Sequence, residues 1–459
     1  METGDPGRAG TGWSMVRLST ATKSSVLAPT RQLSRPGRVV ILLNCCCRPV
    51  RLSGLKELIV RKWMLLLVSL AGSVWMSGDA DAAQLPRESR DPYRLNILDF
   101  GPVDQAGVQD DSAALANVVT AANRYTEAGK PACVYIPAGI YRIVTPPPPF
   151  ALAGCIEGDG SAQSILSIDA RFTGDLFAWS EAWAATTPGP TVVGLQIRGD
   201  RTGQAQQNAF VFYDRNDNVY MSDVTVNDLH GRVLYSGVTR AKPQAYMRES
   251  HFTSLRFFND GAPGVPVIEF NSQGTAESDA TNEIRLSQVD IYGAAGPGLV
   301  IRNNGSSGVR NITFEALRIE GLQQKVFGAS QGDLLAIGDP VMGGSVNNIR
   351  LTDVELIDAG SGYCAFRMSA PSPAQEPYQI TMQGAIGGGQ PYGQGLCISS
   401  GRSSVFRLSG IHSFGTNVVV GANVTQLVLD GGGQEASWSY SIDPTSVRGV
   451  SFPALSPYH

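Results

Sequence analysis

Aromatic and charged residues are both scarce in this sequence. Phe, Trp and Tyr make up 8% of the 459 residues, and Asp, Glu, Lys and Arg together make up 17%. So little charge beside 52 glycines argues against a helical bundle or a coiled coil. The net charge of −4 gives no basic surface of the kind that a dedicated nucleic-acid binder needs. Hydrophobic residues reach 42%, which is enough for a large core and excludes wholesale disorder.

The apolar run from Met64 to Val74 is only about half as long as a membrane-spanning helix requires. It follows Arg61 and Lys62 and precedes the small residues of 80–83, which is the order of a secretory signal. We therefore expect 60–83 to be a signal peptide and the protein to be periplasmic or secreted, with no stable membrane anchor. A cytosolic protein with an unusual tail is the alternative.

The segment 1–59 shows neither helical nor strand periodicity, and we expect it to be a non-native or disordered extension, with translation starting near Val60 or Met64. The remaining 84–459 is expected to form a single domain. It holds 25 basic and 35 acidic residues, a net charge near −10, so a polyanion is repelled on average unless a local basic patch attracts it.

Four cysteines follow the predicted signal peptide: Cys133, Cys155, Cys364 and Cys397. An even number in an exported protein is compatible with two disulfides, and four cysteines allow three pairings. Cys364 and Cys397 are 33 positions apart, close to the repeat length described below, so we favour the pairs Cys133–Cys155 and Cys364–Cys397. Free buried thiols are the alternative.

The first part of the domain reads as a cap. A short strand is expected over 95–101, and the acidic pair before Ser112 predicts the start of a helix that runs to about Tyr125. A strand, a turn and a second strand follow over 134–143. The prolines of 146–149 predict a loop.

Beyond residue 190 an eight-residue pattern recurs, with apolar residues at its first, third, sixth and eighth positions. Clear copies begin at Val219, Ile284, Ile312 and Ile349, and weaker copies begin at Ser250, Ile380 and Phe406. The mean spacing is about 31 residues, which is typical of a solenoid or a propeller. Each copy predicts two half-buried strands with a bend between them. Because no helical segment separates the copies, we predict an all-β, right-handed parallel β-helix with a short N-terminal capping α-helix.

Two recurring polar positions are expected to shape this coil. Asn218, Asn311 and Asn348 each precede the first apolar position of a copy, and Asn tolerates left-handed backbone and forms stacked side-chain ladders. Asp223 and Asp353 share the bend between the two strands. We interpret both positions as structural.

Three segments carry a family resemblance: "NILDFGPVDQAGVQDDSAALANVVTAA", "VYIPAGIYRI" and "CIEGDGSAQSILSI". Together they resemble the pectate-lyase-like superfamily of β-helix proteins, which includes rhamnogalacturonases, polygalacturonases and epimerase-like members. The resemblance covers about 95–170 by motif, and the rest by repeat pattern only. One departure is that Asp104-Gln105-Ala106-Gly107 stands where the family has Gly-Asp-Gly.

The resemblance implies an exported carbohydrate-active protein, a polysaccharide lyase or glycoside hydrolase acting on an acidic polysaccharide, as a monomer or homotrimer. The catalytic elements of polygalacturonases are not intact, and the nearest fragment is 227–232, "NDLHGR". A non-catalytic β-helix that binds glycan or serves as a structural module therefore remains the alternative. No nucleic-acid partner is implied.

Candidate catalytic residues follow from the repeat register. The position between the last two apolar residues of each copy predicts one outward-facing row, formed by Thr225, Arg256, Asp290, Arg318, Glu355, Ile386 and His412. Four consecutive members alternate in charge: Arg256, Asp290, Arg318 and Glu355. We interpret them either as an ion-pair ladder on the sheet surface or as a catalytic groove. Asp290 and Glu355 would lie about 9.6 Å apart at the backbone, a separation compatible with inverting hydrolysis.

A second candidate is Asp228 with His230, in the most acid-rich stretch of the domain, which also holds Asp214, Asp217 and Asp223. A turn or bend is the alternative interpretation for Asp217, Asp223 and His230. No cofactor is expected, although these carboxylates are hard ligands of the kind that Ca²⁺ takes. The aromatic residues considered for stacking on sugar rings are Trp179, Trp183, Tyr213, Tyr220 and Tyr292.

Overall fold

The computed structural model describes residues 93–130, 132–151, 154–180, 189–202, 206–238, 245–321, 331–341, 343–387, 394–408, 417–430 and 439–442. All of them lie in the second of the two units into which the chain divides, Asp91–His459. The predicted signal peptide and the extension before it fall outside the described residues, as do Trp183 and His412. Within the described ranges, no helix combines the length and the apolar character needed to cross a membrane.

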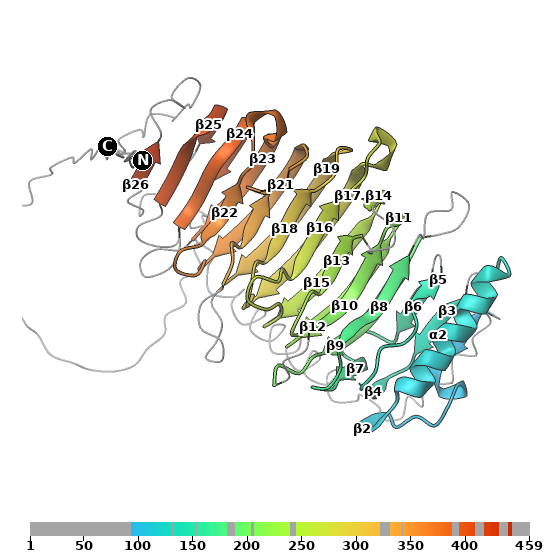
Figure 1. Cartoon of the computed structure of the whole chain (residues 1–459). Coiled ribbons are helices and arrows are strands. Elements are labelled where there is room, and N and C mark those ends of the chain that lie inside the picture. Colours follow the sequence, from blue (N-terminus) through green and yellow to red (C-terminus); the bar gives the residue numbers. More distant parts are fainter. Residues whose placement is uncertain are drawn as a thin grey trace, which may run out of the picture. The chain divides into compact units, whose positions relative to one another are not determined.

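The described unit is a right-handed parallel β-helix, as the repeat predicts. Its 26 strands pair in parallel with strands of the preceding and following coils, and Figure 1 shows them side by side in sequence order, with the one α-helix at the N-terminal end. Strand pairing across coils satisfies the backbone N–H and C=O groups of all but the terminal coils.

One row of paired strands carries the predicted repeat. In order of pairing it comprises β1 (Arg94–Asn96), β3 (Cys133–Ile136), β6 (Cys155–Gly158), β9 (Thr191–Arg198), β12 (Tyr220–Asn227), β15 (His251–Phe258), β17 (Thr281–Tyr292), β19 (Val309–Glu320), β21 (Val346–Ile357), β23 (Tyr378–Ile386), β24 (Gln394–Leu408) and β25 (Asn417–Asp430).

A second row forms another face of the coil. It comprises β5 (Phe150–Ala151), β8 (Gly174–Ser180), β10 (Gln207–Tyr213), β13 (Leu234–Gly237), β16 (Ile268–Ser272), β18 (Leu299–Asn303), β20 (Leu335–Ile337), β22 (Cys364–Met368) and, after parts of β24 and β25, β26 (Ser439–Ile442).

The remaining elements complete the early coils. Two short series of strands join the first row, namely β2 (Ala106–Asp110), β4 (Gly139–Ile143) and β7 (Ser164–Ile168) at β9, and β11 (Arg215–Asp217) and β14 (Tyr246–Arg248) at β17. Three 3-10 turns are present: η1 (Ile97–Asp99), η2 (Glu277–Asp279) and η3 (Pro373–Gln375). The strand expected over 95–101 is therefore shorter than predicted and gives way to η1.

The capping helix α2 (Ser112–Glu127) begins and ends close to the predicted positions and buries its apolar stripe against the first coils. Its acidic pair works differently from the prediction. Asp111, at the N-cap, makes no side-chain cap bond, and its carboxylate instead accepts the N–H groups of Asp104 (2.8 Å) and Arg142 (3.0 Å). Asp110 accepts the first N–H of the helix (2.9 Å). Asp110 thus caps the first N–H of the helix, and Asp111 links the start of the helix to the first coil by hydrogen bonds.

The coil turns at recurring left-handed residues, as predicted. Asn218, Asn311 and Asn348 have φ of 56°, 57° and 51°, and Asp223 and Asp353 have φ of 52° and 55°. The amide of Asn348 donates to Asn311, which in turn donates to Asn282 (2.7 Å) in the neighbouring coil. The side-chain ladder is thereby confirmed for Asn311 and Asn348, with Asn282 as an additional member, whereas the corner next to Asn218 holds Glu249.

Two weak copies of the repeat are out of register with the structure. The bend residue is missing from β23, so its residues alternate strictly, Ala385 lies opposite Glu355, and Ile386 points into the core. The prediction that Ile386 belongs to the outward row is therefore wrong. Phe406 pairs with Met382 and not with Ile380, so the last copy begins two residues earlier than predicted.

Stacked apolar side chains fill the interior, and the two disulfides join neighbouring coils. Cys133–Cys155 and Cys364–Cys397 are both present, which confirms the favoured pairing. Trp179 is completely buried, between Phe150 and Phe212 at ring-centroid distances of 5.1 and 5.0 Å. Its suggested role in sugar stacking is therefore wrong, because both of its faces are covered.

Candidate functional site

A polar groove follows the asparagine corner across consecutive coils. Its larger cavity, of about 600 Å³, is lined by Asn218, Glu249, His251, Glu283, Arg285, Asn311, Thr313, Asn348 and Arg350. A second cavity, of about 340 Å³, shares His251, Arg285 and Thr313 with the first and adds Tyr220, Phe252, Thr253, Leu286, Ser287 and Glu315. We call the two together the corner groove. Carboxylates, guanidinium groups, amides and hydroxyls dominate its lining, the mixture that a chain of sugar hydroxyls and charges can pair with.

Glu249 and Glu283 stand where other coils place asparagine. They follow Asn218 in the corner row, with φ of 51° and 57°. The N–H of Glu249 donates to the carbonyl of Asn282 (3.0 Å), and the N–H of Ser250 donates to the carbonyl of Glu283 (3.2 Å), which puts the two glutamates in adjacent coils. A left-handed glutamate is less stable than a left-handed asparagine, and two adjacent carboxylates repel each other. The carboxylate of Glu283 nevertheless accepts the side-chain amide of Asn282 (3.3 Å).

The next outward row supplies cationic and aromatic groups beside these carboxylates. Tyr220, His251, Arg285, Thr313 and Arg350 are paired in register from β12 to β21, one residue per coil. Successive side chains in such a row lie about 4.8 Å apart at the backbone. The groove therefore aligns its donors and acceptors along the solenoid, the direction in which an extended polymer would lie.

Sequence reasoning did not single out this set, although the signal was present. The rule that identified Asn218 also gives Glu249 and Glu283, because each precedes the first apolar position of its copy. His251 and Arg285 follow two residues later. The corner position holds glutamate in two copies, so a search for asparagine alone does not find it.

The predicted charge ladder exists as a row on the second half of the same strands. Arg256 pairs with Asp290, Asp290 with Arg318, and Arg318 with Glu355. Among the described residues, one neighbouring pair of this row forms an ion pair, Arg318–Glu355 at 3.3 Å, with both side chains more than a third exposed. The row lies across the bend from the corner groove, whose lining includes none of its four charged members.

Acids with raised pKa gather at the end of this row. Burial raises the pKa of Glu320, where Arg318 acts in the opposite direction and Asp358 and Glu355 add to the rise. Burial also raises the pKa of Asp358. Arg318 lies 3.5 Å from Glu320. It also lies over the ring of Tyr292, which stacks on Phe258, so Tyr292 is engaged within the protein.

The other predicted pair lies at a different corner. Asp228 is exposed, with φ of 56°, and His230 follows the buried Leu229. The carboxyl group of Asp260 is completely buried beneath this turn and accepts the N–H of Leu229 (2.7 Å). The pKa of Asp260 is raised to about 8, chiefly by burial and also by the charge of Asp228, while the hydrogen bond from Leu229 and the charge of Arg201 act in the opposite direction. The structure thus adds a third acid that the sequence pattern did not indicate.

The remaining acids of that stretch have separate partners. Asp217 binds Arg248 through two hydrogen bonds of 2.9 and 2.8 Å, and Asp223 accepts both the N–H and the hydroxyl of Ser161. Asp214 accepts the hydroxyl of Ser180 (3.1 Å). Asp214 and Asp223 have φ of 62° and 52°, as expected at turns, whereas Asp217 is the last residue of strand β11.

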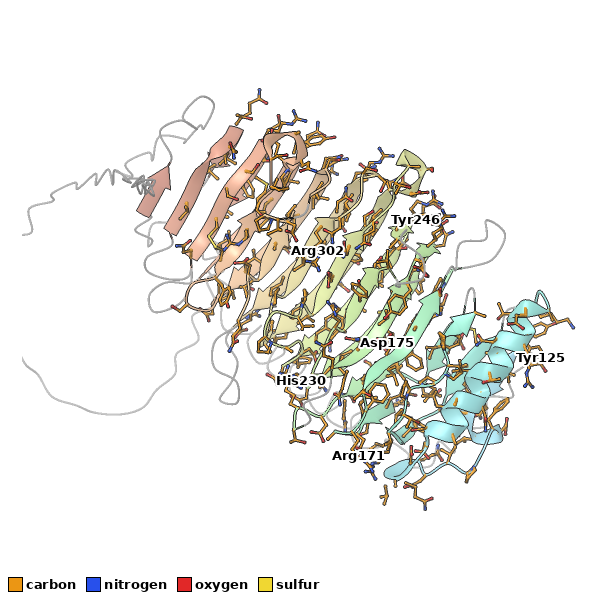
Figure 2. The ribbon with its side chains drawn as sticks, in the orientation of Figure 1. Tyr125, Arg171, Asp175, His230, Tyr246 and Arg302 are labelled. Atoms are coloured by element: carbon orange, nitrogen blue, oxygen red, sulfur yellow. A yellow bond between two sulfur atoms is a disulfide. The ribbon has the colours of Figure 1, made fainter. Side chains whose placement is uncertain are left out.

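A buried ion-pair cluster lies on the face formed by the second strand row, where Figure 2 labels Asp175 and Arg302. Glu269 is completely buried and accepts from Arg232 Nε (2.7 Å) and from Arg302. Nearby, the hydroxyl of Tyr213 donates to Asp175 (2.7 Å), so this tyrosine is engaged within the protein. Tyr220 therefore remains the sugar-stacking candidate, with 42% of its surface exposed.

Metal-ligating side chains gather at one place in the described part of the chain. Cys133, Cys155 and Glu157 have their ligand atoms within 4.8 Å of one another. The two sulfur atoms are bonded to each other, so they are not available as thiolate ligands. Calcium binding by the acids of the turns stays a prediction.

Comparisons with known proteins find similar folds but no similar sequences. No protein-family model and no curated protein matches the chain. ORF18 of Geobacillus virus E2 is 11% identical with a TM-score of 0.39, over 86% of this chain and 66% of its own, so the match spans less than two thirds of the viral protein. The exopolygalacturonase of Thermotoga maritima is 10% identical with a TM-score of 0.43, over 76% of this chain and 90% of its own.

The catalytic unit of a GH87 alpha-1,3-glucanase from Streptomyces thermodiastaticus is 15% identical with a TM-score of 0.36, over 78% of this chain and 69% of its own. The structural neighbours are right-handed β-helix proteins. The likeness is one of fold.

Proposed function

We propose that this protein is an exported carbohydrate-active enzyme that binds an acidic polysaccharide along the corner groove and cleaves its glycosidic bonds there. The observation that carries the proposal is the replacement of asparagine by Glu249 and Glu283 at two consecutive corners, inside a cavity of about 600 Å³. Residues that cost stability at a groove are expected where binding or catalysis needs them.

The chemistry that fits these residues best is glycoside hydrolysis. Two carboxyl groups flanking a glycosidic oxygen can serve as general acid and as base or nucleophile. Arg285 and Arg350, which line the same cavity, would pair with the carboxylate groups of an acidic chain. Tyr220, at the exposed end of the row, would stack on a sugar ring.

The register of His251 and Arg285 favours a second reaction, β-elimination of a uronic acid. They occupy the same position in adjacent coils. A guanidinium that neutralises the uronate carboxylate makes the neighbouring C–H more acidic, and a neutral imidazole beside it would accept the proton. A lyase would leave an unsaturated sugar, whereas a hydrolase would not.

The test is incubation of purified 84–459 with a panel of acidic and neutral polysaccharides. Hydrolysis is expected to release reducing ends without ultraviolet absorbance, and elimination is expected to release both. Glu283→Gln should abolish hydrolysis, and His251→Gln should abolish elimination. Retained glycan binding with neither product would contradict the enzymatic proposal and identify a non-catalytic glycan-binding module.

The same assay also tests whether the active site lies instead at one of the two sites predicted from the sequence. Asp290→Asn tests the row of Arg256, Arg318 and Glu355, and Asp228→Asn tests the turn that holds His230. Both variants are expected to keep full activity if the corner groove is the active site. Loss of turnover in either, with Glu283→Gln active, would move the site to that surface.

A further inference from the structure

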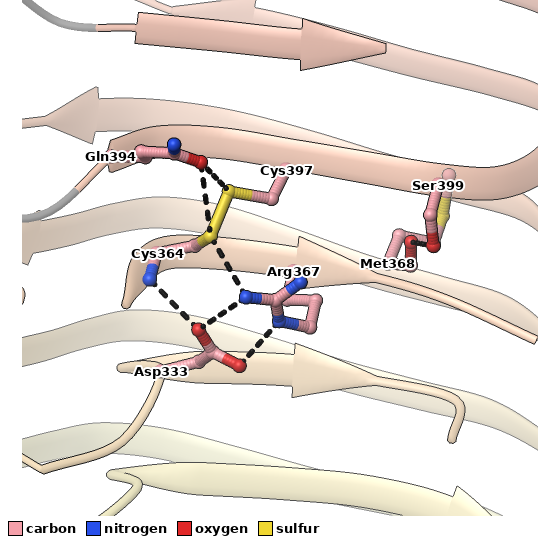
Figure 3. The surroundings of a disulfide bond; sticks show 7 residues. All are labelled: Asp333, Cys364, Arg367, Met368, Gln394, Cys397 and Ser399. Carbon is pink, nitrogen blue, oxygen red and sulfur yellow. Dashed lines mark hydrogen bonds and ion pairs between the residues drawn. A yellow bond between two sulfur atoms is a disulfide. The ribbon is translucent and has the colours of Figure 1, made fainter. Parts of the chain in front are cut away.

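The surroundings of the Cys364–Cys397 disulfide match two thiols better than a disulfide. The bond joins β22 to β24, which are neighbours in consecutive coils. Both sulfur atoms have polar neighbours, and Figure 3 shows Arg367 and Asp333 on one side of the bond and Gln394 on the other. Arg367 and Gln394 both interact more favourably with reduced cysteines than with a disulfide.

Arg367 is placed to stabilise a thiolate on Cys364. Its Nη2 lies 3.2 Å from Cys364 Sγ. Asp333 holds the guanidinium in this position, with Arg367 Nε donating to Oδ2 (2.5 Å) and Nη2 donating to Oδ1 (3.2 Å), and the same carboxylate accepts the N–H of Cys364 (2.8 Å). A fixed cationic donor beside sulfur lowers the pKa of a thiol, whereas a disulfide sulfur is only a weak acceptor. The negative charge of Asp333 reduces this effect but also fixes the donor in place.

Gln394 complements the other sulfur atom. Its side-chain oxygen lies 2.9 Å from Cys397 Sγ and 3.8 Å from Cys364 Sγ. A disulfide sulfur carries no hydrogen and cannot donate, so the shorter contact becomes a hydrogen bond only when Cys397 is a thiol. Reduction therefore creates two interactions, a thiolate with Arg367 and a thiol with Gln394.

The second disulfide has the opposite electrostatic surroundings. Cys155 Sγ lies 4.0 Å from the carboxylate of Glu157, which itself pairs with Arg94 at 3.1 Å. A carboxylate beside sulfur disfavours the thiolate and so disfavours reduction. The two bonds offer a comparison within one molecule.

We propose that Cys364 and Cys397 form a redox-active pair that an external dithiol reduces in preference to Cys133–Cys155. A thiolate of the dithiol attacks the sulfur of Cys397, which is the more exposed residue of the pair at 6% against 1%, and Cys364 leaves as the thiolate beside Arg367. The second thiol of the reductant then closes on its own mixed-disulfide sulfur. This step expels Cys397 and passes it the proton, so the pair gains two electrons and the dithiol becomes a disulfide.

Reduction removes a covalent link between the coil of β22 and the C-terminal coils that begin with β24. Strand pairing between β22 and β24 remains, so the coils stay associated but can separate more easily. The pair would thus make the stability of the C-terminal coils depend on the redox state of the compartment.

The experiment uses the full chain with both disulfides formed and dithiothreitol as the probe. Samples are quenched over time with labelled iodoacetamide, and each cysteine is quantified by peptide mass spectrometry. Cys364 and Cys397 are expected to react first. Arg367→Met should slow their reduction about tenfold and leave Cys133–Cys155 unchanged, and Arg367→Lys should restore part of the rate. Arg402 lies on β24, the strand of Cys397, and forms an ion pair with Glu376. Arg402→Met is the matched control and should have no effect on the rate of reduction.

A second measurement separates chemistry from local unfolding. In Cys397→Ser, titration of Cys364 by the ultraviolet absorbance of its thiolate should give a midpoint below the ordinary value of about 8.5. Adding Arg367→Met should raise that midpoint. Equal reduction of the two disulfides, or a Cys364 midpoint unaffected by Arg367, would overturn the proposal.

Discussion

Glu249 and Glu283 occupy the same left-handed corner of adjacent coils, a position that Asn218 and Asn311 hold on either side of them. The pair places two carboxylates side by side at the rim of the corner groove. The amide of Asn282 donates to the carboxylate of Glu283 (3.3 Å), and the equivalent corners of later coils hold the left-handed residues Gln379, Ser403 and Gln426, so this corner accepts several kinds of side chain. We propose the corner groove as the site of function because one cavity there holds two carboxylates from adjacent coils.

Asparagine at these two corners should increase the stability of the fold and abolish its activity. Glu249→Asn and Glu283→Asn are each expected to raise the free energy of unfolding by about 1 kcal/mol, because Asn tolerates left-handed backbone and removes a repulsion. The same variants should lose polysaccharide turnover. Urea unfolding and the product assay measure the two effects, and a variant that is more stable but fully active would contradict the assignment of the site.

The coil register also predicts the stereochemical outcome of hydrolysis. Glu249 and Glu283 are one coil apart, about 4.8 Å at the backbone, which is near the separation of about 5–5.5 Å found in retaining enzymes. Asp290 and Glu355 are two coils apart, which suits inversion. Proton NMR of the first product should therefore show retention of the anomeric configuration. Inversion would favour the charge ladder over the corner groove.

Asp260 should make stability fall as the pH rises. Its pKa is about 8 in the fold, chiefly because of burial, against 3.8 in the unfolded chain. Between these values the unfolded chain has released a proton that the folded protein still holds. The free energy of unfolding should therefore decrease by up to about 1.4 kcal/mol per pH unit from about pH 4 to about pH 8.

Asp260→Asn should remove this dependence, because an amide accepts the N–H of Leu229 without ionising. Urea unfolding at pH 5 and pH 8 should show that the free energy of unfolding falls with pH in the wild type but not in the variant. Asp228→Asn, at the exposed neighbour, is the control and should leave the slope nearly unchanged. Parallel profiles for the wild type and Asp260→Asn would show that Asp260 is ionised in the fold.

Buried and exposed ion pairs of the same chemistry should differ in their contribution to stability. Glu269 is completely buried between Arg232 and Arg302, so Glu269→Gln should cost about 3–5 kcal/mol by leaving two partly buried cations without their anion. Glu355→Gln removes the exposed partner of Arg318 and should cost less than about 1 kcal/mol. Urea unfolding measures both changes. Equal decreases in the free energy of unfolding for the two variants would show that burial does not determine how much an ion pair contributes to stability.

Local patterns in the sequence were sufficient to predict much of the fold. The spacing of Val219, Met221, Val224 and Val226 predicts two half-buried strands and a bend. All four side chains are buried and the bend is present at Asp223, but a single strand, β12, runs through it. The repeat also brought Cys364 within one coil of Cys397. The weak copies after Ile380 went out of register because the bend residue is absent from β23, and a single missing residue reverses which side chains face inward.

The order of strands, bends and asparagine corners follows from the sequence alone, since each depends on residues close together in the chain. The tertiary structure alone decided which side chains share a surface. Residues such as Glu249 and Glu283, or Arg367 and Asp333, are some 34 positions apart and meet only when coils stack. Stacking also decides burial, and with it the pKa of Asp260 and the enclosure of Glu269, because both depend on how far water is excluded by chain that is remote in sequence.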